Sequence, residues 1–418
     1  MLEYIRKLWK IAELRNKILY TFGMLLLFRL VGCIPAPGID LTRLGMGGTD
    51  LPLLDMMNMM TGGAMSQMTI MAMGISPYIN SSIIMQLLCI ALPVLERMQQ
   101  EEGGREKINR ISRYVTIALA VIQAIGLSNG LGYAKDGLWN NILIGVSMAG
   151  GTALAMWIGE RITDKGIGNG ISLLIFAGIV SNLFNGIVAG FRNAGTVTAF
   201  LGAFAILAVL VILTFVVTFI DLGERRIPLQ IAKQVKGRRV YGGQNTHMTL
   251  KVISVGVMPL IFAYSFLSFP GTIGQLVAPN SGFTAWCNDN LVNGAWFHLI
   301  LSALLIFAFT FFYSSISFDA KKQAEQLQHQ GATIPGRRGK DIASFLQRTT
   351  NRLNLFAACF LAVLAAIPTL MLSGLSLQVP FAASSMLIAV SVSLESMRTI
   401  KGEMAIRGIE SDKDNGFM

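Results

Sequence analysis

The residues in this sequence best suited to bind a metal are four closely spaced methionines. Met65, Met68, Met71 and Met73 form an M-x-x-M-x-x-M-x-M pattern. Thioether sulfurs at such a spacing could bind Cu(I), which prefers soft ligands. No histidine or cysteine accompanies them in this stretch, and flexible methionine side chains also serve as adaptable apolar packing. We expect packing. A metal-handling protein stays an alternative, and it predicts stoichiometric Cu(I) binding by the purified protein.

Two glycine-containing stretches partly match nucleotide-binding loops. Residues 166–170 read Gly-Ile-Gly-Asn-Gly, but they follow an apolar run rather than a strand and do not complete G-x-G-x-x-G. Near Gly339 and Lys340 the P-loop pattern also fails, because Ile334 stands where glycine is required and Asp341 replaces serine or threonine. We therefore expect any energy source to reside in a partner protein.

Candidate acid–base residues are scarce. The histidines, at positions 247, 298 and 329, lie in polar segments or near the edge of an apolar run. Arg29 and Glu395 lie inside apolar runs but near their ends, and we expect the long Arg29 side chain to reach toward the membrane surface. We predict no catalytic residue, no metal site and no cofactor. An ion-coupled transporter usually needs ionisable groups near the membrane midplane, so an inverted-repeat secondary transporter of a small solute is only the alternative function.

The composition defines the elements that position these residues. The chain has 418 residues, of which 53% are hydrophobic and 14% charged, against about 25% charged in a soluble domain. This excludes a disordered chain and argues against an ordinary soluble enzyme. Runs of mostly apolar residues long enough to cross a bilayer as helices occur at 18–34, 75–94, 114–130, 141–159, 171–191, 197–220, 253–273, 296–317, 353–374 and 381–397. The predicted fold class is an all-α polytopic membrane protein of ten transmembrane helices.

Basic residues are distributed very unevenly among the connecting segments. Of the 34 lysines and arginines, 30 fall in the two termini and in segments 95–113, 160–170, 221–252 and 318–352, whereas 3 fall in the remaining connections. Basic loops face the cytoplasm. We therefore predict a multi-pass protein of the cytoplasmic membrane, with both termini cytoplasmic.

The two longest cytoplasmic segments, 221–252 and 318–352, carry 14 of these basic residues. We expect each to contain helix-like stretches and to present basic residues at a tip, near 236–241 and 335–340. Part of this charge follows from topology and from attraction to anionic lipid. A polyanionic partner such as ribosomal RNA would also suit such projections, because lysine and arginine bind phosphates.

Several motifs, in order along nearly the whole chain, carry a family resemblance. They are Phe28-Arg29, the Pro-Ala-Pro-Gly-Ile-Asp stretch at 35–40, and the stretches 62–66, 73–88, 159–172 and 237–247. In these motifs the sequence closely resembles the SecY/Sec61 family of protein-conducting channels. The resemblance implies two pseudo-symmetric inverted halves, residues 1–195 and 196–418, hinged between the fifth and sixth spans. An odd number of spans per half makes such an inverted repeat geometrically possible.

The resemblance also implies specific site residues. A ring of aliphatic side chains would form the waist of the channel: Ile75, Ile79, Ile171, Ile175, Ile261 and Ile388. A plug of about residues 57–73, including Met65, Ser66, Gln67 and Met68, would close the channel on its outer side. A lateral gate, with Asn80 and Gln86 as its polar residues, would separate the second span from the seventh and eighth.

The implied partners follow from the same family. Arg238, Arg239 and Arg338 match loop-tip arginines that the family uses against the motor ATPase SecA and the ribosome. A SecE-like and possibly a SecG-like small membrane subunit, signal peptides, nascent chains and the lipid bilayer are further implied partners. Three positions depart from relatives: Ile253 stands where an asparagine often faces the plug, Gln67 replaces an arginine found in some relatives, and Gly339 stands where a proline often follows the loop arginine.

Overall fold

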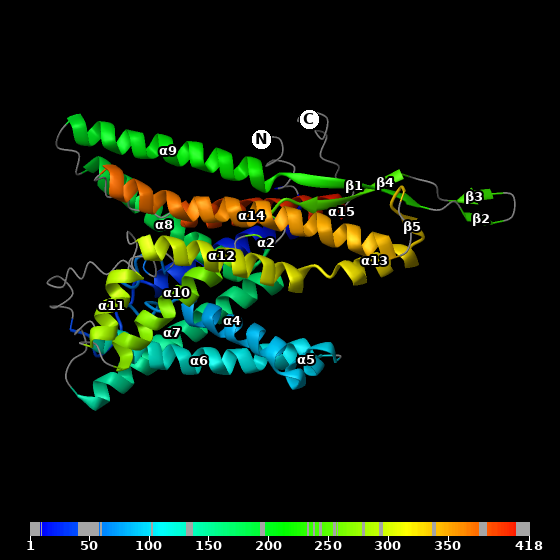
Figure 1. Cartoon of the computed structure of the whole chain (residues 1–418). Coiled ribbons are helices and arrows are strands. Elements are labelled where there is room, and N and C mark those ends of the chain that lie inside the picture. The colour runs from blue at the N-terminus through cyan, green and yellow to red at the C-terminus, as the bar shows by residue number, and fades with distance from the viewer. Residues whose placement is uncertain are drawn as a thin grey trace.

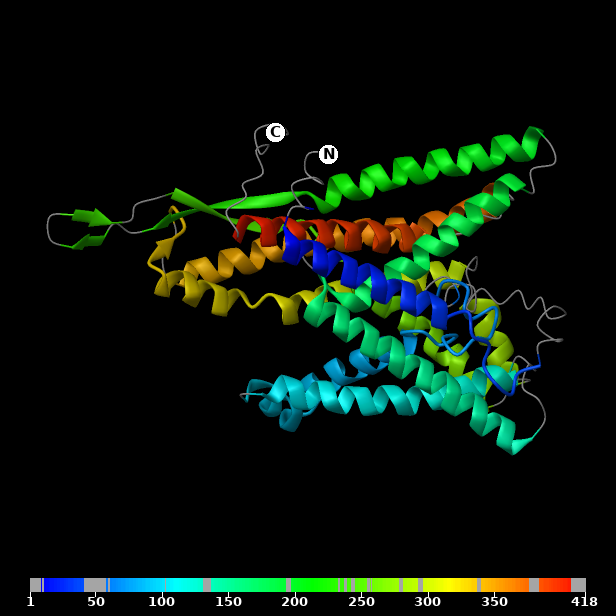
Figure 2. The same ribbon diagram turned by 180° about the vertical axis from the view of Figure 1, so that it is seen from behind.

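Long helices running roughly side by side make up most of the computed structural model (Figures 1 and 2). The structure describes residues 9, 11–40, 58, 61–101, 103–130, 137–192, 197–231, 234–236, 239–241, 245–253, 256, 258–277, 281–291, 296–336, 340–375 and 383–406. The helices of the first part are α2 (Ala12–Val31), α4 (Ser76–Ala91), α5 (Pro93–Gln100), α6 (Gly104–Gly130), α7 (Leu138–Lys165), α8 (Gly170–Arg192) and α9 (Val197–Asp221). Those of the second part are α10 (Met258–Val277), α11 (Gly282–Asn290), α12 (Trp296–Ser317), α13 (Ala320–His329), α14 (Lys340–Leu375) and α15 (Ala383–Ile406).

Each of the ten apolar runs overlaps one long helix: α2, α4, α6 to α10, α12, α14 or α15. By length and hydropathy, four candidate spans are found among the described residues: Glu106–Ser128, Trp139–Lys165, Trp296–His329 and Asp341–Ala366. A fifth is added if α4 and α5 count as one span bent by 105°. Several helices are therefore able to cross a membrane.

Helix ends differ from the ends of the apolar runs. α6 begins ten residues before the predicted range starting at 114, and α14 begins thirteen residues before the one starting at 353. Both extensions carry charged residues that hydropathy excludes but that form helices well. Apolar runs therefore locate the part of a helix that can lie in lipid, and not the end of the helix.

A small antiparallel sheet replaces the helix-like stretches predicted in segment 221–252. Strand β1 (Glu224–Ile231) pairs with β4 (Asn245–Lys251), from Glu224 opposite Lys251 to Gln230 opposite Asn245. The two-residue strand β5 (Ala332–Thr333) pairs with the end of β1, and β2 (Gln234–Lys236) pairs with β3 (Arg239–Tyr241) beyond the sheet. The prediction of helix was wrong because Ile227 and Leu229 are buried at every second position, which is the period of a strand.

The sheet joins the two long basic segments into one unit. Ile227 and Leu229 of β1 share a cluster of buried apolar side chains with Leu327 of α13 and Leu346 of α14. The paired strands β2 and β3 extend farthest from the helices (Figure 1). In segment 318–352, by contrast, the helix-like stretches that were predicted are present as α13 and the start of α14.

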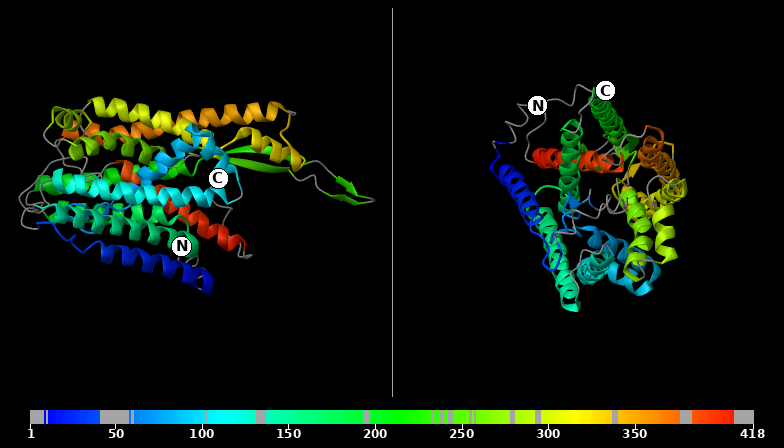
Figure 3. Two further views of the ribbon diagram at one scale, coloured as in Figure 1. Left: turned by 90° about the horizontal axis from the view of Figure 1, so that it is seen from below. Right: turned by 90° about the vertical axis from the view of Figure 1, so that its left-hand side faces the viewer.

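The basic segments are gathered at one end of the bundle. Lys17 near the start of α2 bonds to Glu403 near the end of α15, and Leu14 packs with Ile167 and Met404. Figure 3 shows α2 and α15 side by side at the end that also carries the strands. Residues 61–75 lie toward the opposite end (Figure 2).

Candidate functional site

All six isoleucines proposed as a ring belong to one region of the interior. Five of them are less than 8% exposed and share one connected cluster of buried apolar side chains: Ile75, Ile79, Ile175, Ile261 and Ile388. Ile171 is half-buried and packs against that cluster. They come from the start of α4 and from α8, α10 and α15, so both halves of the chain contribute.

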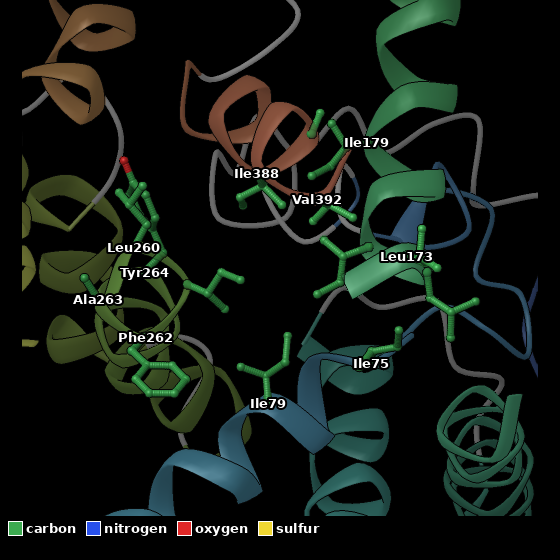
Figure 4. Close-up of a cluster of buried hydrophobic side chains, with 14 of the residues drawn as sticks. Ile75, Ile79, Leu173, Ile179, Leu260, Phe262, Ala263, Tyr264, Ile388 and Val392 are labelled. Carbon is green, nitrogen blue, oxygen red and sulfur yellow. The ribbon is translucent and has the colours of Figure 1, made fainter. Parts of the chain in front are cut away.

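Figure 4 shows how these elements surround the same interior. Ile75 and Ile79 project from the start of α4, Ile388 lies opposite them on α15, and the Leu260–Tyr264 stretch of α10 closes a third side. Phe262 in that stretch packs edge-on against Phe309 and Tyr313, with ring centroids 6.1 and 5.8 Å apart, which joins α10 to α12. The apolar centre is thus framed by elements far apart in sequence.

The described part of the predicted plug is a compact series of turns. Its backbone is fixed to the chain that follows α2, because Ala36 N–H donates to Met68 O at 3.1 Å and Ile70 N–H donates to Ile34 O at 2.9 Å. Pro35 and Thr69 form an isolated β-bridge between these bonds. The proline-rich motif at 35–38 therefore has a structural role, which is to pair with residues 68–70.

The methionines of this segment pack as apolar side chains. Met65, Met68 and Met73 are at most 3% exposed and share a cluster with Ile144 and Met148 of α7. Met71 belongs to the other cluster, which contains five of the six isoleucines. Packing divides the four sulfurs between two regions, so the arrangement does not favour a Cu(I) site. Ser66 and Gln67 are exposed.

Arg29 does not extend to the membrane surface, so that expectation was wrong. Its guanidinium donates from Nη1 to Gly62 O at 3.0 Å and from Nη2 to Ala177 O at 2.5 Å and Gly178 O at 3.5 Å. The carbonyls of a neighbouring helix and turn satisfy the charge locally, so there is no need for it to reach water. Arg29 consequently connects α2, the turn at Gly62 and α8.

Gly151 also has a role that the sequence did not reveal. It belongs to a Gly-x-x-x-Ala-x-x-x-Gly stripe on α7 that predicts helix–helix packing. A Cβ at Gly151 would lie 2.1 Å from Ile70 O, so this position accommodates the turn at Ile70 rather than a helix. Gly159, at the other end of the stripe, does face α8, where a Cβ would lie 3.0 Å from Ile171 Cγ1.

The predicted gate residues lie on α4, and both are half-buried. Gln86 lines a cavity of about 230 Å³ together with Ser112 of α6 and Ile316 of α12. Its Oε1 atom is buried and has no hydrogen-bond partner among the described residues. Ser81, on the adjoining part of α4, donates to Ser112 O at 2.8 Å. α4 is therefore hydrogen-bonded to α6, while a cavity separates part of it from α12.

Of the loop-tip arginines, one is in a described strand. Arg239 begins β3, and Arg238 and Arg338 lie outside the described residues. The structure places the backbone of Arg239 in the paired strands that extend farthest from the helices (Figure 1).

Ile253, where relatives often carry an asparagine, lies two residues after the end of β4 and is 4% exposed. The adjacent Val252 N–H donates to Gly223 O at 3.0 Å. The structure therefore places Ile253 beside the sheet and before α10.

Buried charge is rare in the described chain. Among its buried side chains the only carboxylate is Asp221, at the C-terminal end of α9. Arg398 donates to the Asp221 backbone oxygen at 3.1 Å and lies 3.9 Å from its carboxylate. His298 is buried on α12 and bonds to Leu291 O through Nδ1 at 2.9 Å. No group of three or more metal-ligating residues occurs among the described residues. This arrangement gives no support to a transporter with a coupled ion at the midplane.

Asn182 is a further residue that sequence reasoning missed. Its Nδ2 donates to Asn58 O at 2.8 Å, and Asn58 Oδ1 in turn accepts from Ser66 N–H at 2.9 Å. A polar amide within an apolar run was the only available signal, and it does not identify a backbone acceptor 124 positions away. The fold alone brings them together.

The comparisons with known proteins agree with this geometry. A family model described as SecY matches residues 69–397. The protein translocase subunit SecY of Streptomyces scabiei is 36% identical over 434 residues, which cover 98% of this chain and 99% of the relative. SecY of Escherichia coli strain K12 is 37% identical over 420 residues, which cover 96% and 94%.

Solved channels share the fold. The structure of a protein-conducting channel has a TM-score of 0.71 at 19% identity and covers 98% of this chain and 99% of its own. Sec61 in the canine ribosome–channel complex from the endoplasmic reticulum has a TM-score of 0.67 at 17% identity, with the same coverage. The structures support the fold, the two relatives match almost from end to end, and the family model spans most of the sequence. This chain belongs to the SecY family.

Proposed function

We propose that this chain is the protein-conducting channel subunit of a bacterial translocase, with the six isoleucines as its constriction. The observation that supports this proposal most directly is that the isoleucines come from four helices, in both halves of the chain, and meet in one apolar region. Members of this family are channel subunits and not enzymes. The energy that moves a polypeptide through the channel would therefore come from a partner protein. A chain in transit would pass between the isoleucines as an unfolded polypeptide.

The chemistry of the ring suits this task. A narrow aliphatic constriction loses its water readily and offers an ion nothing in place of its hydration shell. Contacts between aliphatic groups are non-directional, so the same side chains can yield to any polypeptide sequence. The ring would therefore block ions while admitting chains of very different composition.

We assign residues 57–73 to the plug. Methionine side chains adapt to irregular surfaces, and Met65, Met68 and Met73 fill the space beside α7. Opening would move the segment away from this seat. The bonds from residues 68–70 to 34–36 would then keep the end of the segment attached to the chain that follows α2.

The ten long helices would each cross the membrane, five in residues 1–195 and five in residues 196–418. The halves would open about the connection between α8 and α9. The lateral gate would open between α4 on one side and α10 and α12 on the other. An apolar segment of about 20 residues could then leave for the lipid, while polar chain continues through the ring.

The partners are proposed on chemical grounds and on the family. The end of the bundle with the sheet and the helices α13 and α14 would face the cytoplasm and carry Arg238, Arg239 and Arg338 for SecA and the ribosome. One solved relative of similar fold is in a ribosome–channel complex. SecE-like and SecG-like subunits would occupy lipid-facing helices, and signal peptides would enter at the gate.

Site-specific crosslinking tests the channel assignment. A photoreactive amino acid at Ile79 or Ile175 should form an adduct with a secretory chain stalled in transit, because both side chains line the constriction. Val180, on the same helix as Ile175 but 42% exposed, is the matched control and should give little adduct. A translocating chain that reacts at neither Ile79 nor Ile175 would show that the constriction lies elsewhere.

A further inference from the structure

Polar contacts hold the first part of the plug segment, defined here as the plug base: residue 58 and residues 61–66. Arg29 Nη1 donates to Gly62 O at 3.0 Å, while Nη2 donates to Ala177 O at 2.5 Å in α8. Ala177 carries only a small side chain and Gly178 none, so the guanidinium can approach the backbone of α8. One cation thus bridges three separate elements.

A second contact to the plug base comes from the same helix. Asn182 Nδ2, about one turn beyond Gly178, donates to Asn58 O at 2.8 Å. That carbonyl oxygen also accepts from Gly63 N–H at 3.0 Å, and Asn58 Oδ1 accepts from Ser66 N–H at 2.9 Å. The amide of Asn182 therefore binds an oxygen that already organises the turn of the plug base.

The backbone of the plug base fits the arginine closely. Gly62 has a φ of +70°, and a Cβ built there would lie 2.0 Å from Arg29 Nη1. Gly63 has a similar φ of +91°, but a Cβ there would meet its nearest atom, Asn182 Oδ1, at 3.7 Å, which is ordinary contact. Two adjacent glycines thus share the left-handed conformation, and only the first is needed for the arginine.

We propose that Arg29 and Asn182 form a latch that holds the plug base in the closed channel. This inference rests on the proposed assignment of residues 57–73 as the plug. Both latch residues are positioning residues, because they bind the plug and not the transported chain. Bonds with a charged donor are stronger than neutral ones, so the arginine contributes more than the amide.

The latch also connects the plug to the ring. α8 carries Ile175 at the constriction and, two to seven residues later, Ala177, Gly178 and Asn182 at the latch. A polypeptide that widens the ring displaces α8. This moves Asn182 and the carbonyl oxygens that bind Arg29 away from the plug base. When the plug leaves, Arg29 keeps its bonds to α8, and the guanidinium stays in position for reclosure.

The test is the resting ion conductance of the channel complex in a planar bilayer, measured without a translocating chain. Arg29→Gln and Asn182→Ala should each raise the conductance, roughly tenfold or more for Arg29→Gln, because a charge-assisted bond to the closed state is lost. Both variants should also export precursors with weakened signal peptides. Gly62→Ala should reproduce Arg29→Gln, since its methyl group displaces the guanidinium.

Two matched variants control for strain and charge. Gly63→Ala introduces the same left-handed strain without touching Arg29, and Arg192→Gln removes an exposed cation from the end of α8. Both should leave the channel sealed. If the Arg29→Gln protein does not accumulate in the membrane, the comparison of Gly62→Ala with Gly63→Ala tests the latch instead. The latch is overturned if Gly62→Ala stays sealed or if Gly63→Ala leaks equally while translocation by the unaltered complex is normal. Failure of the unaltered complex to translocate would instead overturn the proposed function.

Discussion

At the scale of single residues, buried polar groups distinguish helix pairs that stay together from the pair expected to separate. Ser81 of α4 donates to Ser112 O of α6, and Asn354 of α14 donates to Ser314 Oγ of α12 at 2.5 Å. Hydrogen bonds between helices in a membrane add about 0.6–2 kcal/mol. Gln86 donates no such bond across the proposed gate, and its buried Oε1, like Asn354 Oδ1, has no partner among the described residues. The polar bonds thus join α4 to α6 and α12 to α14, on opposite sides of the proposed gate.

Replacing the unpaired amide should therefore stabilise the closed gate. An unsatisfied buried polar atom costs about 1–3 kcal/mol, and Gln86→Leu removes it from the cavity beside Ile316. We expect test segments of marginal hydrophobicity to leave for the lipid less often, with secretion of soluble precursors unchanged. The measurement is the inserted fraction for a series of segments with graded leucine content. Gln99→Leu, an exposed position on the same cavity, is the control. Equal or greater insertion with Gln86→Leu would contradict the prediction.

Sequence motifs predict which residues meet in the apolar interior better than which residues hold the turns at 61–66. Ile75, Ile79 and Ile171 fall in recognisable motifs, whereas Ile175, Ile261 and Ile388 lie outside them. The fold brings all six into one interior region, and their role as a ring stays a prediction. The bonds of Arg29 and Asn182 end on backbone oxygens 33 and 124 positions away. A carbonyl acceptor has no side-chain identity, so no pattern in the sequence indicates the pairing.

At the scale of secondary-structure elements, the two basic segments act through a shared sheet. Pairing of β1 with β5 connects residues 230–231 to residues 332–333, and the apolar face of β1 packs on α13 and α14. A contact made at the tip of β2 and β3 would therefore be transmitted to α14, which continues into the bundle. Continuous apolar runs made the long helices predictable. The sheet was missed because its alternation covers only a few residues within a highly charged segment.

Charge reversal at the tip tests this docking role. Arg238→Glu with Arg239→Glu should weaken binding of SecA or of ribosomes by about tenfold or more and should reduce the salt dependence of ribosome binding, because phosphate contacts release counterions. The measurement is binding to membranes or to reconstituted complex over a range of salt concentrations. Arg225→Glu with Arg226→Glu changes the net charge equally at exposed positions of β1 and should have a smaller effect. Unchanged binding of both partners by the tip variant would exclude those arginines from the interface.

At the scale of the whole molecule, the bundle has two chemically different ends. One end combines the start of α2, the end of α15 and the turn between α7 and α8, as the Lys17–Glu403 bond and the Leu14 cluster require. The same end carries the sheet (Figure 3). The other end carries the plug segment and α11 (Figures 1 and 2). The basic segments belong to the first end. The positive-inside rule therefore predicts that this end faces the cytoplasm.

Orientation is tested by labelling single cysteines from each side of the membrane. The native cysteines are replaced first, since Cys33 and Cys359 are exposed. Phe283→Cys on α11 lies at a position that is 55% exposed at the plug end. Lys322→Cys on α13 lies at the sheet end, where the lysine side chain is 79% exposed. A membrane-impermeant maleimide should react with Phe283→Cys in right-side-out vesicles and with Lys322→Cys in inside-out vesicles. The reverse pattern would place the basic sheet outside, where neither a ribosome nor a cytoplasmic motor could reach it. Labelling of both from one side would contradict a bundle that crosses the membrane between these two ends.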